Sequence, residues 1–342
     1  MVDQRWNPVC ERPCGLAFPE HVDPTGENGP TRVQARSARW EWLAPGWYVR
    51  ADRPDCAEQR ILDASCRLRN GDAVTAWAAL RWRGAAFFDG LAPGGHDDLP
   101  VPLLARGSLC SLPAITLSKA QLAPSEWQYV AGLPVTTVQR ALFDEVVRRN
   151  ELWASVEAVC MAAAARLISA RLFSTHLLHR SAWTGVPLAR KAAGLARDDL
   201  RSPPEVRLHL TWELVAELTR APANRPVFDL DGNLIGVPDL FDPVSGTVGE
   251  YDGEHHRDIE QHRSDVSRED RFRDHGLEYF TAVRGDSRST VAARMHRTRA
   301  RAKFLPPESR AWTLDPPSWY VMPESLDAYF ERTGMEERLT HR

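Results

Sequence analysis

The spacing of apolar residues predicts a compact set of helices and strands over residues 201–303. The Ser-Pro-Pro-Glu sequence at 202–205 has a capping residue, prolines where a missing N–H costs least and an acid in the first turn, so it predicts a helix start. The apolar row that follows has a spacing of four residues up to Leu218. The elements beyond it are two strands around Asp231-Gly232-Asn233, an acidic strand through Glu250, a helix at 258–276, a strand at 277–283 and a helix at 287–303, in the order α-β-β-β-α-β-α.

The pattern before and after this segment predicts four further parts. Residues 1–52 combine a Pro- and Gly-rich arm with a helix-like stretch at 32–40 and a β-ribbon. Residues 53–135 form a small α/β module, and residues 136–200 form a helical connector. Residues 304–342 form a tail with a short helix at 324–332. Helices are predicted at 54–69, 73–82, 138–150, 152–166, 174–183 and 186–197, and strands within 100–117 and 127–135.

Three carboxylates stand close together in the predicted strands. Side chains two apart share one face of a strand, so Glu250 and Asp252 would point together, and a hairpin through the Pro-Val-Ser-Gly turn would bring Asp239 beside them. Such a cluster repels itself unless a divalent cation neutralises it, and oxygen-only ligation suits Mg²⁺ or Mn²⁺. The pattern predicts a metal site at Asp239, Glu250 and Asp252, with the alternative that Asp252-Gly253 is a turn that binds nothing.

These residues resemble the PD-(D/E)XK nuclease superfamily, and more closely its bacterial family with a very-short-patch-repair-type endonuclease domain. The matching positions are a helix acid, a strand acid, an E-x-D-G sequence followed by histidine, and a D-x-x-R helix, here Glu205, Asp239, Glu250 to Gly253, His255 or His256, and Asp265 to Arg268. The resemblance covers about residues 201–303 and implies a restriction-endonuclease-like α/β fold that hydrolyses DNA phosphodiester bonds.

The implied mechanism is metal-assisted hydrolysis. Acidic side chains would hold Mg²⁺ or Mn²⁺, a histidine would move the proton of the attacking water, and an arginine would stabilise charge on the phosphate. The residues in these catalytic roles are Glu205, Asp239, Glu250, Asp252, His256 and Arg268. The superfamily has Lys where this chain has Asp252, so the cationic role would pass to His255, His256 or Arg268, with Gln261 positioning water. For Arg268, an ion pair within its own helix is the alternative.

Arginines supply the predicted nucleic-acid contacts. Residues 284–303 contain seven basic residues and one acid, Asp286, so this helix could lie along DNA through Arg294, Arg297 and Arg301, with a solvated surface helix as the alternative. The helix-like stretch and ribbon that end in Gly46-Trp47-Tyr48-Val49 resemble the N-terminal winged helix of AbiEi-type antitoxins, which implies DNA contacts from Arg32, Arg36 and Arg39. A structural ribbon covered by tryptophans explains the same residues.

The composition of the chain indicates where the protein is located but says little about its chemistry. The net charge of -3 does not mark a nucleic-acid binder, and the chain has neither an N-terminal signal nor an apolar run that could span a bilayer, so we expect a cytoplasmic protein. Six cysteines show no convincing zinc pattern, although Cys10 and Cys14 have a spacing seen in some zinc sites.

The sequence is compatible with two functions. One is a metal-dependent endonuclease in DNA repair or genome defence, acting as a homodimer if it cuts both strands symmetrically. The other is an antitoxin-like transcriptional regulator with an inactive nuclease fold.

Overall fold

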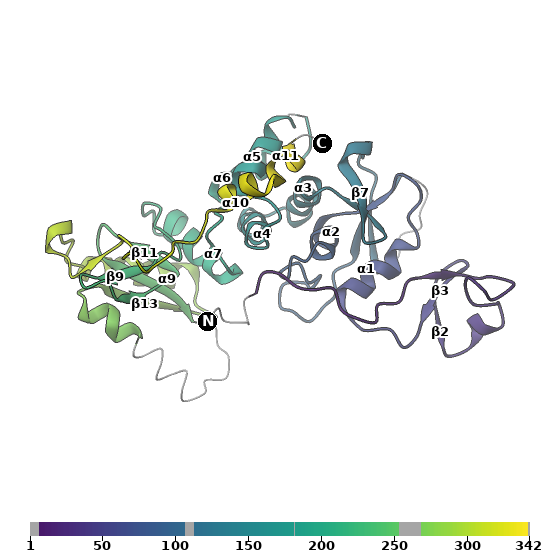
Figure 1. Cartoon of the computed structure of the whole chain (residues 1–342), viewed down its shortest axis with the longest axis horizontal. Helices are drawn as coiled ribbons and strands as arrows, with labels where there is room; N and C mark the ends of the chain where they lie inside the picture. The colour runs from purple at the N-terminus through teal and green to yellow at the C-terminus, as the bar shows by residue number, and fades with distance from the viewer. Residues whose placement is uncertain (1–6, 107–112, 181, 253–267, 341–342) are drawn as a thin grey trace. The chain divides into compact units, whose positions relative to one another are not determined.

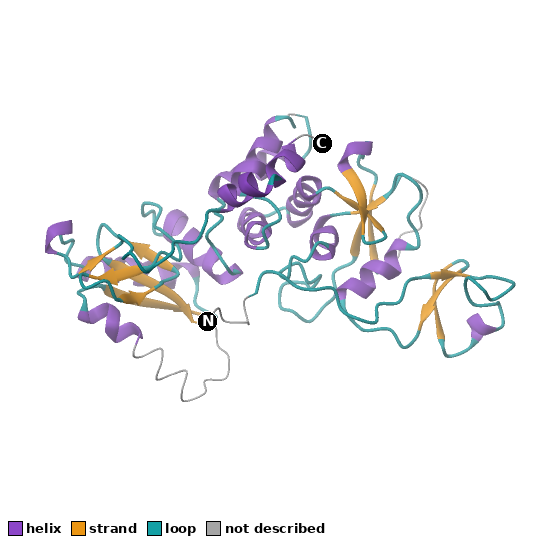
Figure 2. Ribbon diagram, in the orientation of Figure 1, coloured by secondary structure: helices purple, strands orange, loops and turns teal. Residues whose placement is uncertain are grey.

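The structure is a computed structural model that describes residues 7–106, 113–180, 182–252 and 268–340. The chain forms two compact units, one made of Met1–Gly194 with Phe330–Arg342 and the other of Leu195–Tyr329. Both units combine helices with β-sheets, as Figures 1 and 2 show, and the predicted mixed α/β class is confirmed. The described residues include no helix with the length and apolar character needed to cross a bilayer.

The first unit begins with a small antiparallel sheet. Its strands are β1 (Glu20–His21), β2 (Trp40–Ala44) and β3 (Trp47–Arg50), in the order β1-β3-β2. The predicted ribbon is therefore present, but the predicted helix at 32–40 is wrong. Only the 3-10 turn η2 (Gln34–Arg36) forms there, because the backbone becomes extended at Ser37 and Trp40 already pairs with Arg50.

A five-stranded sheet follows in the same unit. Its order is β6-β5-β4-β8-β7, and it mixes parallel and antiparallel pairs. The strands are β4 (Ala73–Val74), β5 (Val101–Leu104), β6 (Ile115–Ser118), β7 (Trp127–Val130) and β8 (Leu133–Thr136), with helices α1 (Ala57–Ser65) and α2 (Ala76–Trp82) and the 3-10 turn η3 (Pro124–Glu126). The helix predicted from residue 73 starts three residues later, because Ala73 and Val74 pair with β5 and Val74 also with β8.

Helices complete the first unit. They are α3 (Val138–Arg149), α4 (Leu152–Ala164), α5 (Ala170–Leu178), α6 (Val186–Leu195) and, near the C-terminus, α11 (Met335–Thr340). The boundary between the two units falls within α10 (Leu326–Thr333), at Phe330. The helix predicted at 174–183 lies earlier, at α5, because Ser169 caps it by accepting a hydrogen bond from the Leu172 N–H. The end of the chain returns to this unit, where Gln139 donates to the Leu339 carbonyl and Arg171 pairs with Glu336.

The second unit starts with helix α7 (Pro203–Leu210), which continues as one π-helical turn, η4 (Thr211–Val215). One sheet contains β9 (Val227–Asp229), β10 (Leu234–Gly236) and β14 (Trp312–Thr313), and another contains β11 (Leu240–Asp242), β12 (Thr247–Asp252) and β13 (Glu278–Val283). Residues 268–274 are helical, α9 (Arg288–Arg301) follows β13, and the 3-10 turn η5 is Pro307–Ser309. Residues 225–242 thus form three strands where two were predicted, because Pro238 lacks the N–H needed to continue a ladder.

The sheet β11-β12-β13 is buried on both faces. On one face Phe280 joins a cluster with apolar residues of α7 and α9, including Leu208 and Met295. On the other, Val248 packs with Phe272 and with Phe241 of the neighbouring strand. β11 and β12 form an antiparallel hairpin, and β12 runs parallel to β13 across six paired residues. This arrangement fixes the ends of β11 and β12, where the predicted acidic residues lie.

Replacing Gly249 with Ala is expected to destabilise the second unit by about 1–3 kcal/mol, the usual cost of overpacking a core. A Cβ at Gly249 would overlap the ring of Phe280 from the paired strand. The matched control is Gly194→Ala on α6, where a Cβ meets nothing within 4 Å and should add about 0.5–1 kcal/mol through helix propensity. Urea unfolding of both variants measures these opposite changes in the free energy of unfolding. An unchanged free energy of unfolding in Gly249→Ala would contradict the proposed overlap with Phe280.

Candidate functional site

Two carboxylates, Glu205 and Glu250, act electrostatically on a third, Asp239, at the start of β11. Asp239 immediately precedes β11, Glu250 lies in β12, and Glu205 lies in the first turn of α7. The hairpin pairs Leu240 with Gly249, so Asp239 comes beside the carboxyl end of β12 and its Oδ2 accepts a hydrogen bond of 2.9 Å from the Tyr251 N–H. The predicted hairpin is confirmed, and it brings Asp239 to the acidic strand.

Asp239 is the electrostatic centre of this cluster. Burial raises its pKa to about 8, and the negative charges of Glu205 and Glu250 push the pKa in the same direction. The Tyr251 N–H and the Arg268 guanidinium act against this rise without cancelling it. The carboxyl group of Asp239 therefore retains a proton at neutral pH unless a positive charge additional to Arg268 joins the cluster.

Glu205 is held by hydrogen bonds at both carboxylate oxygens. Its Oε1 accepts from the Ser202 hydroxyl at 2.8 Å, and its Oε2 accepts from the Arg201 N–H at 2.9 Å and the Asn224 side chain at 2.8 Å. Ser202 also caps α7, so the Ser-Pro-Pro-Glu sequence forms the predicted helix start. These bonds fix Glu205 in a buried position beside Asp239 and occupy part of its capacity to bind a cation.

Arg268 comes to the cluster from the helical residues 268–274. Its guanidinium lies 2.6 Å from Glu250 Oε1 and also donates to the Val237 carbonyl. On the other side of Glu250, Oε2 accepts a 2.8 Å hydrogen bond from the hydroxyl of Tyr279, whose pKa is raised by burial and by the charge of Glu250. The i,i+4 pair within this helical segment joins Arg273 to Glu269. Arg268 thus forms a tertiary contact with the acidic strand.

Asp239, Glu250 and Asp252 were predicted as metal ligands, and the resemblance implied Glu205 as a further acid of the site. Asp252 ends β12 two residues after Glu250 and is half-buried, but the carboxylates that raise the pKa of Asp239 are Glu205 and Glu250. Within the ranges that the structure describes, no three His, Cys, Asp or Glu side chains converge as a metal-binding group. His256, predicted as the proton carrier, lies outside the described residues, together with His255, Gln261 and Asp265.

His209 and Arg197 belong to the cluster's surroundings and were not predicted. His209 Nε2 lies 2.8 Å from the carbonyl of Asp239, and Arg197 donates to His209 Nδ1 at 3.2 Å, so the ring is neutral with its proton on Nε2. Burial, followed by the charge of Arg197, lowers the pKa of His209 to about 3. Its position four residues after Glu205, on the same helix face, was the available sequence signal.

The arginines of α9 line a cavity of about 440 Å³ along β13. Arg294 pairs with Asp286 at 2.8 Å, Arg301 pairs with Glu278 at 3.1 Å, and Arg297 is exposed. Tyr279 lines the same cavity and donates to Glu250, so the basic lining adjoins the acidic cluster. The N-terminal arginines Arg32, Arg36 and Arg39 are exposed in the first unit.

Comparison of the chain with models of protein families, with curated proteins and with solved structures found no match in any of the three.

Proposed function

We propose that the second unit is a metal-dependent endonuclease that hydrolyses DNA phosphodiester bonds with Mg²⁺ or Mn²⁺. The observation that carries the proposal is the negative charge around Asp239, which Arg268 compensates only in part, so that burial and the charges of Glu205 and Glu250 raise the pKa of Asp239 to about 8. A buried acidic cluster costs folding free energy, and a cation that joins it offsets that cost. The order of elements around the cluster also supports the PD-(D/E)XK resemblance.

The oxygen atoms that these acids offer are the donor type that a hard divalent cation prefers. All three carboxylates offer oxygen, His209 is held neutral, and Arg268 is the cation paired with Glu250. Asp239 and Glu250 would hold the metal, with Asp252 at the same strand end as an additional ligand. When bound, Mg²⁺ or Mn²⁺ would polarise the phosphoryl oxygen and lower the pKa of a coordinated water.

The protein's own side chains account for the remaining requirements. Tyr279 and Arg268 orient the two oxygens of Glu250, and the Tyr251 N–H orients Asp239. Arg268, which pairs with Glu250, would take the cationic role of the missing superfamily lysine and stabilise negative charge on the phosphate. His256 is proposed to move the proton of the attacking water. Glu205 would act mainly by charge, because its oxygens already accept three hydrogen bonds.

DNA would approach along the basic surface of α9. Arg297 and Arg301 are exposed there and Arg294 lines the adjoining cavity, while Tyr279 connects that cavity to Glu250. Contacts of this kind bind phosphates without reading sequence, so affinity should fall steeply as salt increases. Arg32, Arg36 and Arg39, which precede β2 in the first unit, would add further contacts. A homodimer would be needed for symmetric cutting of both strands.

The second candidate is a DNA-binding, antitoxin-like regulator whose nuclease fold does not cut. Two observations favour it: Asp252 replaces the superfamily lysine, and Arg268 occupies Glu250 Oε1 at 2.6 Å, where a metal ligand would need a free oxygen. This function needs the basic surfaces but not the acidic cluster.

Cleavage of supercoiled plasmid at low salt with Mg²⁺ or Mn²⁺ tests the proposal. We expect the wild type to nick or linearise the plasmid and the Asp239→Asn, Glu250→Gln double variant to lose activity by at least ~100-fold, since the removed charges hold the metal. The matched control is Asp231→Asn, Glu308→Gln, which neutralises two exposed acids. Salt-sensitive DNA binding by all three proteins without any cleavage would contradict the nuclease and favour the regulator.

A further inference from the structure

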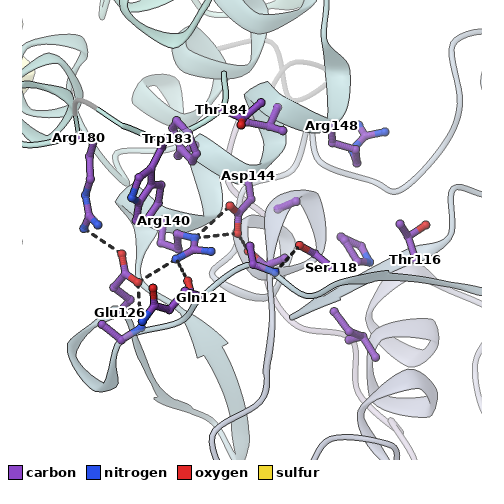
Figure 3. A pocket seen from close by; sticks show the side chains of 18 residues that line it. Thr116, Ser118, Gln121, Glu126, Arg140, Asp144, Arg148, Arg180, Trp183 and Thr184 are labelled. Atoms are coloured by element: carbon purple, nitrogen blue, oxygen red, sulfur yellow. Dashed lines mark hydrogen bonds and ion pairs between the residues drawn. The ribbon is translucent and has the colours of Figure 1, made fainter. Parts of the chain in front are cut away.

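A cavity of about 740 Å³ lies in the first unit, beside the five-stranded sheet (Figure 3). One wall is formed by α3 and by Trp183 and Thr184 in the segment after α5, and another by β5 and the edge strand β6. The size falls within the range of small-molecule sites. Ala76 also lines the cavity and has a positive φ of 49°, a conformation that costs a non-glycine residue about 1 kcal/mol or more.

A buried ionic network forms one end of this cavity. Arg140, whose side chain is 1% exposed, donates to Asp144 at 3.0 Å, to Glu126 at 2.8 Å and to the Gln121 carbonyl at 2.9 Å. Its guanidinium also lies 4.7 Å from the ring centre of Trp183. Burying such a network is costly and seldom adds net stability. Because stability does not explain the network, and because it lies at a cavity of ligand size, we infer that it serves in binding a ligand.

The charges that line the cavity are balanced within the protein. Arg180 pairs with Glu126 at 2.9 Å, and Arg148 is held by both oxygens of Glu145 at 2.7 Å. Arg140 lies between Glu126 and Asp144, and Arg149 lies between Glu145 and Glu157, so four arginines pair with four carboxylates. A charged ligand would lose its hydration without meeting an uncompensated opposite charge, so the balance favours an uncharged ligand.

Asp144 is the acceptor that such a ligand would meet. Its carboxylate lies near the centre of the view in Figure 3 and its side chain keeps 16% exposure. From the described part of the chain it accepts from Arg140 Nε, shared between both oxygens, and from the Thr75 hydroxyl at 2.6 Å. A carboxylate has about four acceptor positions, so capacity remains for a donor from a ligand. Phe143, Val147 and Leu103 supply apolar surface around it.

We propose that this cavity binds a small, uncharged aromatic molecule whose N–H or O–H group donates to Asp144. The ring packs against the apolar wall formed by α3, β5 and Trp183, while the hydroxyls of Thr116 and Ser118 line the side toward β6. Since all of these residues belong to the first unit, the proposal is independent of nuclease activity in the second.

Benzamide and benzoate are suitable probes, because the two have nearly the same shape and differ in charge and in N–H donors. Saturation-transfer NMR titrations of the full chain are expected to give a benzamide Kd in the millimolar range, as for other ligands of about nine heavy atoms. Benzoate should bind at least about ten-fold more weakly, because its carboxylate would face that of Asp144.

Two variants test the location. Asp144→Asn replaces an acceptor oxygen with an amide donor, so it should weaken benzamide about five-fold or more and reduce the preference over benzoate. Thr116→Trp places a large ring from an exposed position of the edge strand into the cavity, without touching the ionic network, and should abolish benzamide binding. Its far-UV circular dichroism should match the wild type, which separates loss of the cavity from loss of the fold.

Three results would overturn the proposal. The first is the absence of saturation transfer to benzamide at concentrations up to about 10 mM. The second is equal affinity for benzamide and benzoate, and the third is benzamide binding by the Thr116→Trp variant.

Discussion

Replacing Asp239 with Asn is expected to raise the free energy of unfolding of the second unit by about 2–4 kcal/mol at pH 8 in EDTA, and by much less at pH 5. The folded-state pKa of Asp239 is about 8, above its usual value of 3.8. The folded chain therefore keeps a proton that the unfolded chain has released, and stability that is complete below pH ~4 declines as the pH rises toward 8. The Asn side chain removes this decline.

Urea unfolding at the two pH values measures the difference, with Asp231→Asn, at an exposed turn, as the control. Addition of Mg²⁺ at pH 8 should stabilise the wild type and leave Asp239→Asn unchanged, because a ligand that binds only the folded state shifts its stability. A pH-independent difference between wild type and Asp239→Asn would show that desolvation and the neighbouring carboxylates do not act on Asp239 as described.

Replacing Arg140 with Met is expected to destabilise the first unit by about 3–5 kcal/mol, the cost of leaving buried carboxylates without their partner. Arg140 is the ion-pair partner of both Glu126 and Asp144, and its side chain is almost fully buried. Arg180 would still neutralise Glu126, but Asp144 would lose a guanidinium that contacts both of its oxygens. Hydrogen exchange of peptides from α3 during urea unfolding would report on this unit separately from the second.

The control for Arg140→Met is Arg171→Met, since Arg171 pairs with Glu336 in a partly exposed position and should cost less than about 1 kcal/mol. Adding Glu126→Gln and Asp144→Asn to Arg140→Met should recover part of the loss, because the unpaired charges are then removed. Equal losses in the Arg140→Met and Arg171→Met variants would contradict the buried network.

Local patterns predicted most of the second unit's elements. The Ser cap of α7, the β11–β12 hairpin, β13 and α9 follow from capping residues, turn residues and short-range periodicity, which act within a few residues. The prediction of a helix at 32–40 was wrong. The arginines and alanines of this stretch favour a helix, but the pairing of β2 with β3 requires an extended backbone at its end.

The membership of the acidic cluster could be predicted only in part. Strand alternation and the hairpin predicted that Asp239, Glu250 and Asp252 lie close together, whereas Glu205 was expected only from the family resemblance, because its effect on Asp239 depends on the packing of α7 against the hairpin. The ion pair of Arg268 with Glu250 joins residues 18 positions apart in the sequence, and no local pattern favours it over a pair within the helix.

By itself the sequence determined the mixed α/β class, the local elements and the acidic and basic residue types, because hydrophobic period, capping and turn chemistry are short-range properties. Only the tertiary structure decided that the charges of Glu205 and Glu250 act on Asp239, that a neutral His209 contacts the Asp239 carbonyl, and that Arg140 joins Glu126 to Asp144 beside a cavity. These features depend on distances between residues separated along the chain, and on the burial that packing imposes on their charges.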